Sequence, residues 1–206
     1  MGAIVKTFLS ELSVQRWDDH RLYHHSRINQ TLHLISALGF LAAYAICLID
    51  IAWAALLAWC LSMVTRQAGH FFFEPRGFDH VNQVSDEHKE AIKVGYNIQR
   101  KIVLMAVWLF IPVGLWISPS WTGWIEPHSS WLEYAHDVGM GWFALGDSAL
   151  VFRVVQLGLT QSWLKGFAWL AKILTDPFHD IWLYHKAPWY MLKGEWIDPM
   201  PHVRSH

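Results

Sequence analysis

A nearly uncharged stretch from His33 to His70, broken in its middle by Asp50, constrains the fold of this chain more than any other feature. Residues 32–49 form an apolar run of eighteen residues without a charge, close to the ~20 residues that a helix needs to cross a bilayer core. Residues 51–64 form a second apolar run, short for a span unless it is tilted or its end is buried in protein. The pair is predicted to form a membrane hairpin that turns at Asp50 and returns the chain to the side it left.

Further apolar segments predict an all-α integral membrane bundle of about four spans, a single domain over residues 1–206. Residues 102–118 are a third span candidate and residues 138–159 a weaker fourth, interrupted by Asp147 and Arg153. Charges inside a span usually face the bundle, so these two are expected to satisfy each other or the backbone. Residues 162–174 are predicted to form an interfacial amphipathic helix that Asp176-Pro177 ends. The region 134–206 thus adds a span and interfacial helices, before a loose tail.

The distribution of charge predicts the topology and limits the function. Lys and Arg occur in residues 1–31, in 66–101 and in the C-terminal region, but not in the Asp50 turn or in 119–131. The positive-inside rule then predicts cytoplasmic termini, in a bacterial inner membrane or an endoplasmic reticulum. Trp116, Trp121, Trp124 and Trp131 are typical of an interfacial belt. A net charge of −1 without a basic stripe argues against nucleic acid as a partner.

Two histidine clusters bracket the hairpin and are expected to meet on one membrane face. His24 and His33 are nine residues apart, so they would converge only if the chain breaks between them, with Ser26 or Asn29 as the N-cap of the first span. His70 and Glu74 are four apart and would share one helical face. One or two further imidazoles would complete a His/carboxylate set that suits non-heme Fe(II).

The remaining histidines and the two cysteines are not expected to join this site. His128 and His136 fall on the opposite side of the predicted membrane, across ~30 Å of hydrocarbon. His179 and His185 are interpreted as part of an interfacial helix, and His80 and His88 as residues of a solvated loop. Cys47 and Cys60, both within apolar segments, predict neither a disulfide framework nor a Cys-based zinc site.

At these residues the chain resembles the yeast-type 2-hydroxy fatty acid dioxygenase family, which includes many bacterial membrane proteins. The first motif, Tyr-His followed by Asn and His, reads Tyr23-His24, Asn29 and His33. The second, Gly-His-x-x-Phe-Glu, is the segment Gly69-His70-Phe71-Phe72-Phe73-Glu74. The order of the motifs and the intervening hairpin also match, and the resemblance covers about residues 20–118.

The resemblance implies an Fe(II)-dependent oxygenase that uses molecular oxygen to shorten 2-hydroxy fatty acids by one carbon. It implies His24, His33, His70 and Glu74 as metal ligands, and it implies that His25 and Asn29 support these ligands without touching the metal. The acyl chain would lie along the hairpin, in or beside the lipid. The cations considered for the substrate carboxylate are Arg27, Arg66 and Arg76.

Two other functions are compatible with the same residues. His20-x3-His24-His25 resembles one histidine box of the di-iron lipid hydroxylases and desaturases, although a second His-x2-His-His box is not found. Alternatively, the chain is an accessory subunit of a larger membrane complex, with histidines that bind heme or nothing. The aromatic segments after Leu159 would then form a docking surface for a protein partner.

Overall fold

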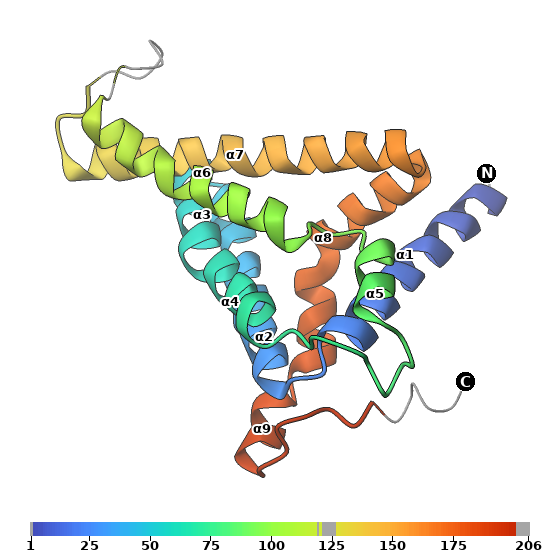
Figure 1. Cartoon of the computed structure of the whole chain (residues 1–206). Helices are drawn as coiled ribbons and strands as arrows, with labels where there is room; N and C mark the ends of the chain where they lie inside the picture. The colour runs from blue at the N-terminus through green and yellow to red at the C-terminus, as the bar shows by residue number, and fades with distance from the viewer. Residues whose placement is uncertain (1, 119, 121–126, 201–206) are drawn as a thin grey trace.

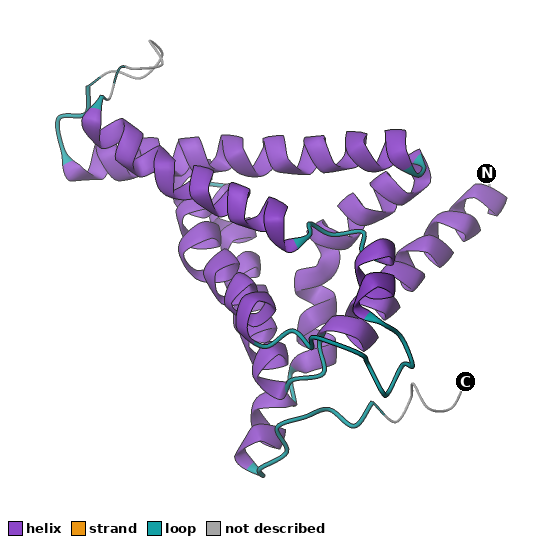
Figure 2. Cartoon of the chain, in the orientation of Figure 1, coloured by secondary structure: helices purple, strands orange, loops and turns teal. Residues whose placement is uncertain are grey.

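The structure of the chain, a computed structural model, describes residues 2–118, 120 and 127–200. All its regular secondary structure in these residues is helical (Figure 2), which confirms the predicted all-α class. The elements are α1 (Gly2–Tyr23), α2 (Arg27–Cys47), α3 (Ile51–Leu57), the π-helical segment η1 (Ala58–Met63), α4 (Val64–Phe72), α5 (Asp86–Ile92), α6 (Ile98–Ile117), α7 (Trp131–Thr160), α8 (Trp163–Tyr184) and α9 (Ala187–Leu192).

Among the described residues, four helices are long and apolar enough to cross a membrane. They are Arg27–Cys47, Ile51–Phe72, Ile98–Ile117 and Trp131–Thr160. The second is longer than the predicted run 51–64, because α3, η1 and α4 continue one another to Phe72. With 22 residues it is long enough for a span.

Each helix of the hairpin begins at a capping residue that lies two or three positions before the backbone N–H groups it binds. Ser26 is the N-cap of α2, in extended backbone conformation, and its hydroxyl accepts from Asn29 N. It therefore supplies the predicted break between His24 and His33. At the far turn the Asp50 carboxylate accepts from Ala52 N at 2.8 Å and from Trp53 N at 3.1 Å, so Asp50 caps α3.

The helices form three sides of a triangular frame (Figure 1). The hairpin of α2 and α3–η1–α4 is one side, α7 with α6 is the second, and α8 with α1 is the third. Glycine allows the close crossing of α7 and α3: a Cβ at Gly139 would lie 2.4 Å from the carbonyl oxygen of Ala52. Small residues at a helix crossing allow the backbones to approach closely.

Helix α8 differs from the prediction, since it continues through Pro177 to Tyr184 instead of ending at Asp176-Pro177. Proline interrupts a helix by removing one hydrogen bond and crowding the preceding turn. Here Asp176 and Asp180, on either side of Pro177, both form ion pairs with Arg66 of α4. These buried long-range contacts outweigh the local cost of the proline.

Arg153 and the C-terminal tail were the subjects of two further expectations. Arg153 donates to the backbone carbonyls of Val94 and Gly95, at 2.5 and 2.9 Å, so the backbone rather than Asp147 satisfies it. The prediction of a loose tail is wrong as far as Met200, because the Asp198 carboxylate pairs with Arg27 at 3.0 Å and Met200 is fully buried.

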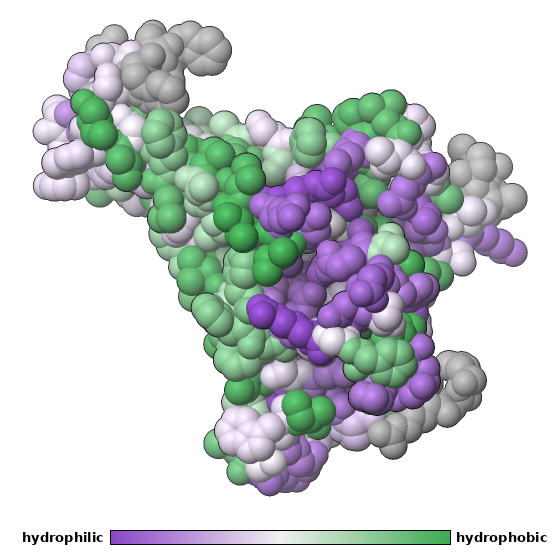
Figure 3. Space-filling view, in the orientation of Figure 1, coloured by the Kyte–Doolittle hydropathy of each residue, from purple (hydrophilic) through white to green (hydrophobic). Residues whose placement is uncertain are grey.

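The exposed surface is sorted by polarity (Figure 3). Apolar residues gather over α6 and over the outer side of the α3–α4 helix, while polar residues gather over α5 and its neighbouring loops. Trp116, one of the predicted belt residues, stacks on Trp131 with ring centroids 5.1 Å apart. The other two predicted belt residues, Trp121 and Trp124, lie outside the described residues.

Candidate metal centre

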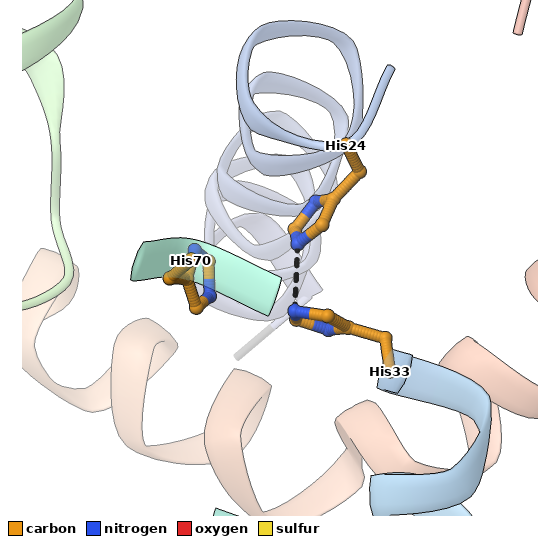
Figure 4. A group of neighbouring side chains, drawn as sticks. All are labelled: His24, His33 and His70. Atoms are coloured by element: carbon orange, nitrogen blue, oxygen red, sulfur yellow. Dashed lines mark hydrogen bonds between the residues drawn. The ribbon is translucent and has the colours of Figure 1, made fainter. Parts of the chain in front are cut away.

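Three imidazoles from three separate helical segments meet at one end of the hairpin (Figure 4). His24 follows the end of α1, His33 lies in the second turn of α2, and His70 lies near the end of α4. One ring nitrogen from each lies within 4.8 Å of those of the other two. His24 and His33 are 1% and 0% exposed, and the His70 side chain is 10% exposed. The predicted convergence of the two clusters is therefore present.

Each imidazole also has an oxygen facing its Nδ1 atom. Nδ1 of His24 lies 2.9 Å from the Asp19 carbonyl oxygen, and Nδ1 of His70 lies 2.8 Å from Glu74 Oε2. Nδ1 of His33 lies 3.5 Å from Asp180 Oδ2. Because a carbonyl or carboxylate oxygen can only accept, the proton of a neutral His24 or His70 ring belongs on Nδ1, whereas Nδ1 of His33 forms no hydrogen bond with any described residue. Metal-binding histidines are commonly oriented in this way, which leaves Nε2 free as the ligand atom.

The two Nε2 atoms of His24 and His33 face each other at 3.1 Å. Without a cation, this contact is a hydrogen bond in which His33 Nε2–H donates to Nε2 of His24; with the His33 proton on Nδ1 instead, both Nε2 atoms carry lone pairs and face a position that a cation could occupy. Two imidazole nitrogens that face one position could both bind an ion placed there, and imidazole donors suit several first-row metals, iron among them.

The protonation state of His24 also suits metal binding. Burial lowers the pKa of His24 well below its usual value, and the neighbouring His33 lowers it further. Asp19 and Asp180 oppose this shift without reversing it. A neutral imidazole is the form that binds a metal.

Asn29 holds two of these histidines through the chain segments that precede them. Its Nδ2 donates to the carbonyl oxygen of Tyr23, at 2.9 Å, directly before His24. Its side chain also lies against Gly69, directly before His70, where an added Cβ would be 2.1 Å from Asn29 Oδ1. Asn29 therefore has the supporting position that the sequence motif implied, and Gly69 is required by close packing.

Glu74 and His25 lie differently from the sequence-based expectation. Helix α4 ends at Phe72, so Glu74 approaches His70 from the following loop and not from a shared helical face. Its carboxylate contacts Nδ1 of His70 and Lys93 Nζ, the latter at 2.6 Å, and it is not part of the three-imidazole group. His25 contacts the Arg21 carbonyl oxygen and, at 3.6 Å, Asp79.

A buried ionic network behind the imidazoles comes from α8, and sequence reasoning missed it. Lys172, Asp176, Asp180 and Tyr184 recur every four residues, so they share one face of α8. Lys172 Nζ lies 2.7 Å from Asp176 and 3.1 Å from Asp19. The regular four-residue spacing across Pro177 was the available signal, and the expectation of a helix break at that proline concealed it.

The network fixes the charges next to the site. Burial lowers the pKa of Lys172, but the nearby carboxylates of Asp176 and Asp19 raise it by a larger amount. The net shift of the pKa is upward, and the ammonium remains charged. Burial likewise raises the pKa of Asp19, but Lys172 and His24 lower it more, and the net shift is downward. The Asp19 carboxylate, whose Oδ2 lies 3.8 Å from Nδ1 of His24, is thus held in its charged form by its contact with Lys172.

A cavity of about 570 Å³ lies inside the triangular frame and reaches His70. This is within the range of about 300–1,000 Å³ typical of ligand pockets. Most of its exposed lining is apolar, with Phe40, Trp59, Leu104 and Trp142 among the lining residues. A second, polar cavity of about 370 Å³ adjoins it, and both cavities include His70 in their lining.

The other histidines lie apart from the three imidazoles. His136 lies 3.2 Å from Asp50, at the opposite end of the hairpin, in agreement with its exclusion from the site. His20 Nδ1 is 3.2 Å from the Tyr184 hydroxyl, and Tyr184 in turn packs its ring against His24 and His33. Across the described parts of the chain, these three imidazoles are the one group of three or more potential ligands that approach closely enough for a shared ion.

The three arginines considered for a substrate carboxylate are engaged elsewhere. Arg66 pairs with Asp176 and Asp180 at 3.3 and 3.1 Å, and Arg27 pairs with Asp198. Arg76 is exposed and donates to the carbonyl oxygen of Phe71.

Comparisons of this chain with protein-family models, with curated proteins and with solved structures find no match. The candidate site must therefore be judged on its own geometry and chemistry.

Proposed function

We propose that this protein is a membrane-embedded non-heme iron oxygenase that acts on 2-hydroxy fatty acids and shortens them by one carbon. The observation that carries the proposal is the convergence of His24, His33 and His70, each with an oxygen facing Nδ1. Three neutral nitrogen donors on one side leave the other positions of a six-coordinate ion open. The sequence resemblance of residues 20–118 points to the same chemistry.

The resemblance of residues 20–118 favours iron at this site. Three imidazoles without a thiolate suit iron or zinc, so the donor set is compatible with iron and the resemblance chooses it. Bound iron would supply the redox chemistry with molecular oxygen that cleavage of the substrate's C1–C2 bond requires. The chain's own residues would hold the ion and keep the imidazoles oriented, with Glu74 fixing the ring of His70.

The surroundings of the site favour a lipid substrate. An apolar cavity that reaches His70 could hold an alkyl chain and exclude water from the reacting end. Four membrane-length helices make direct uptake of that chain from the bilayer practicable. A di-iron hydroxylase would need a second ligand group, and none occurs among the residues that the structure describes.

The proposal is tested by metal analysis and oxygen uptake on the purified full chain. We expect one iron per chain and oxygen consumption that depends on 2-hydroxypalmitate. His70→Ala should lose both iron and activity, while His136→Ala, at the opposite end of the hairpin, should retain both. Two irons per chain, a heme absorbance band, or zinc in place of iron would each refute the proposal, as would equal iron loss in both variants.

A further inference from the structure

Five cationic side chains line the larger cavity, and three of them are neutralised by carboxylates. Arg66 pairs with Asp180 at 3.1 Å and Lys172 pairs with Asp176 at 2.7 Å. Lys93 pairs with Glu74 at 2.6 Å. These cations already have carboxylate partners. Their ion pairs connect α1, α4, α8 and the segment that follows α5 around the site.

The two remaining cations of the lining, Lys101 and Lys165, form no hydrogen bond or ion pair through their amines with any described residue. They differ in their positions. Lys101, in the first turns of α6, lines both the apolar cavity and the polar cavity, and His70 does so as well. Lys165, near the start of α8, lines the larger cavity alone.

A charged ammonium group in a largely apolar cavity wall costs free energy unless a hydrogen-bond acceptor or an opposite charge lies against it. A carboxylate ligand would remove that cost through a charge-assisted hydrogen bond. The lining of the larger cavity is mainly apolar, with Phe40, Trp59 and Trp142 as examples. The ligand that matches both features is an acid with one carboxylate and a long alkyl chain.

We propose that Lys101 binds the carboxylate of such an amphipathic acid, holding it beside His70 while the alkyl chain occupies the larger cavity. The assignment rests on the proposed function, because an oxygenase centre explains why an acid should be held next to the three imidazoles. It replaces the three arginines suggested by the sequence with a lysine that is free to bind. Lys101 thereby selects acids over neutral lipids of equal length.

The test compares palmitate with hexadecanol, which has the same chain length but no charge. Binding to the full chain in a neutral detergent is measured by isothermal titration calorimetry, so that the readout does not depend on turnover. We expect Lys101→Met to weaken palmitate binding about ten- to a hundredfold, the range for one charged hydrogen bond, and to leave hexadecanol binding unchanged. Lys101→Arg should restore most of the affinity for palmitate.

Lys165→Met is the matched control, because it removes an equally unpaired lysine from the same cavity at a distance from the polar one. It should leave the affinity for palmitate unchanged. Equal weakening in both variants, or unchanged palmitate binding in Lys101→Met, would overturn the assignment.

Iron content measured on the same samples separates the two proposals. If wild-type protein holds no iron but palmitate binding depends on Lys101, the proposed function fails and the assignment stands. If iron is present and palmitate binding is independent of Lys101, the assignment alone fails. Retention of iron in Lys101→Met with weakened palmitate binding supports both.

Discussion

Substitution of Gly69 by alanine tests whether the close packing of Asn29 holds the site together. The added methyl group would lie 2.1 Å from Asn29 Oδ1 and 3.4 Å from His33 Cδ2. Restoring an ordinary contact of about 3.4 Å needs a shift of roughly 1.3 Å (3.4 minus 2.1). The Asn29 side chain is fully buried and bonded to the Tyr23 carbonyl oxygen, so it cannot move without losing that bond.

The expected cost has two parts. Overpacking of a close contact costs about 1–3 kcal/mol, and the unpaired buried acceptor at Tyr23 costs about 1–3 kcal/mol more. We therefore expect Gly69→Ala to lower the free energy of unfolding by about 2–6 kcal/mol. Since Asn29 contacts Tyr23 and Gly69, the residues directly before His24 and His70, iron affinity should also fall, by about ten- to a hundredfold.

The assays are chemical unfolding in detergent, followed by tryptophan fluorescence, and titration of the protein with Fe(II) under argon. Gly95→Ala is the control, because a Cβ there meets nothing within 4 Å. The double variant Gly69→Ala/Asn29→Ala identifies the cause: without the Asn29 side chain the methyl group has room, so the two losses should not add. Stability and iron affinity of Gly69→Ala equal to those of Gly95→Ala would refute the reasoning.

Three other predictions follow from contacts around the site. Glu74→Gln should weaken iron binding about ten- to a hundredfold by loosening His70, with little change in fold, as judged by metal titration and circular dichroism. Lys172→Met should destabilise the protein by about 1–3 kcal/mol, because Asp19 loses its lysine partner and the buried Asp176 keeps only its weaker contacts with Arg66 and Arg16; an unfolding curve like that of the wild type would contradict this. The folded-state pKa of Asp19 is lowered from 3.8, so its contribution to stability should be complete well above pH 3.8 and decrease as the pH falls below it, which unfolding at graded acid pH measures.

The hairpin and its caps could be predicted because their causes are local. Residues 32–49 are apolar without interruption, and a capping residue such as Ser26 or Asp50 acts on backbone N–H groups two or three positions away. These two facts predict that His24, His33 and His70 lie on one face of the hairpin. A hairpin returns the chain to one face, and the Ser26 cap breaks the helix between the first two histidines.

The role of Glu74 could not be read from spacing, because it depends on where α4 ends. A four-residue separation places two side chains on one face only while the helix continues, and here the helix ends at Phe72. The carboxylate reaches His70 from the loop and from the side of Nδ1. The same residue pair is therefore close, as the spacing suggested, but in a different geometry.

The contribution of α8 depends on contacts between residues more than a hundred positions apart; the four-residue spacing of its polar residues indicates a shared face but not what that face contacts. Asp180 faces His33, and Tyr184 packs against the rings of His24 and His33, so the C-terminal region forms one wall of the site. This argues against an interpretation of that region as a docking surface appended to a catalytic core of residues 20–118. A chain ending near Leu159 would keep the three imidazoles, yet it would lose the carboxylate beside His33 and the partners of Arg66. The histidine motifs specify which atoms can bind an ion, whereas α8 specifies how the imidazole of His33 is held and which charges surround it.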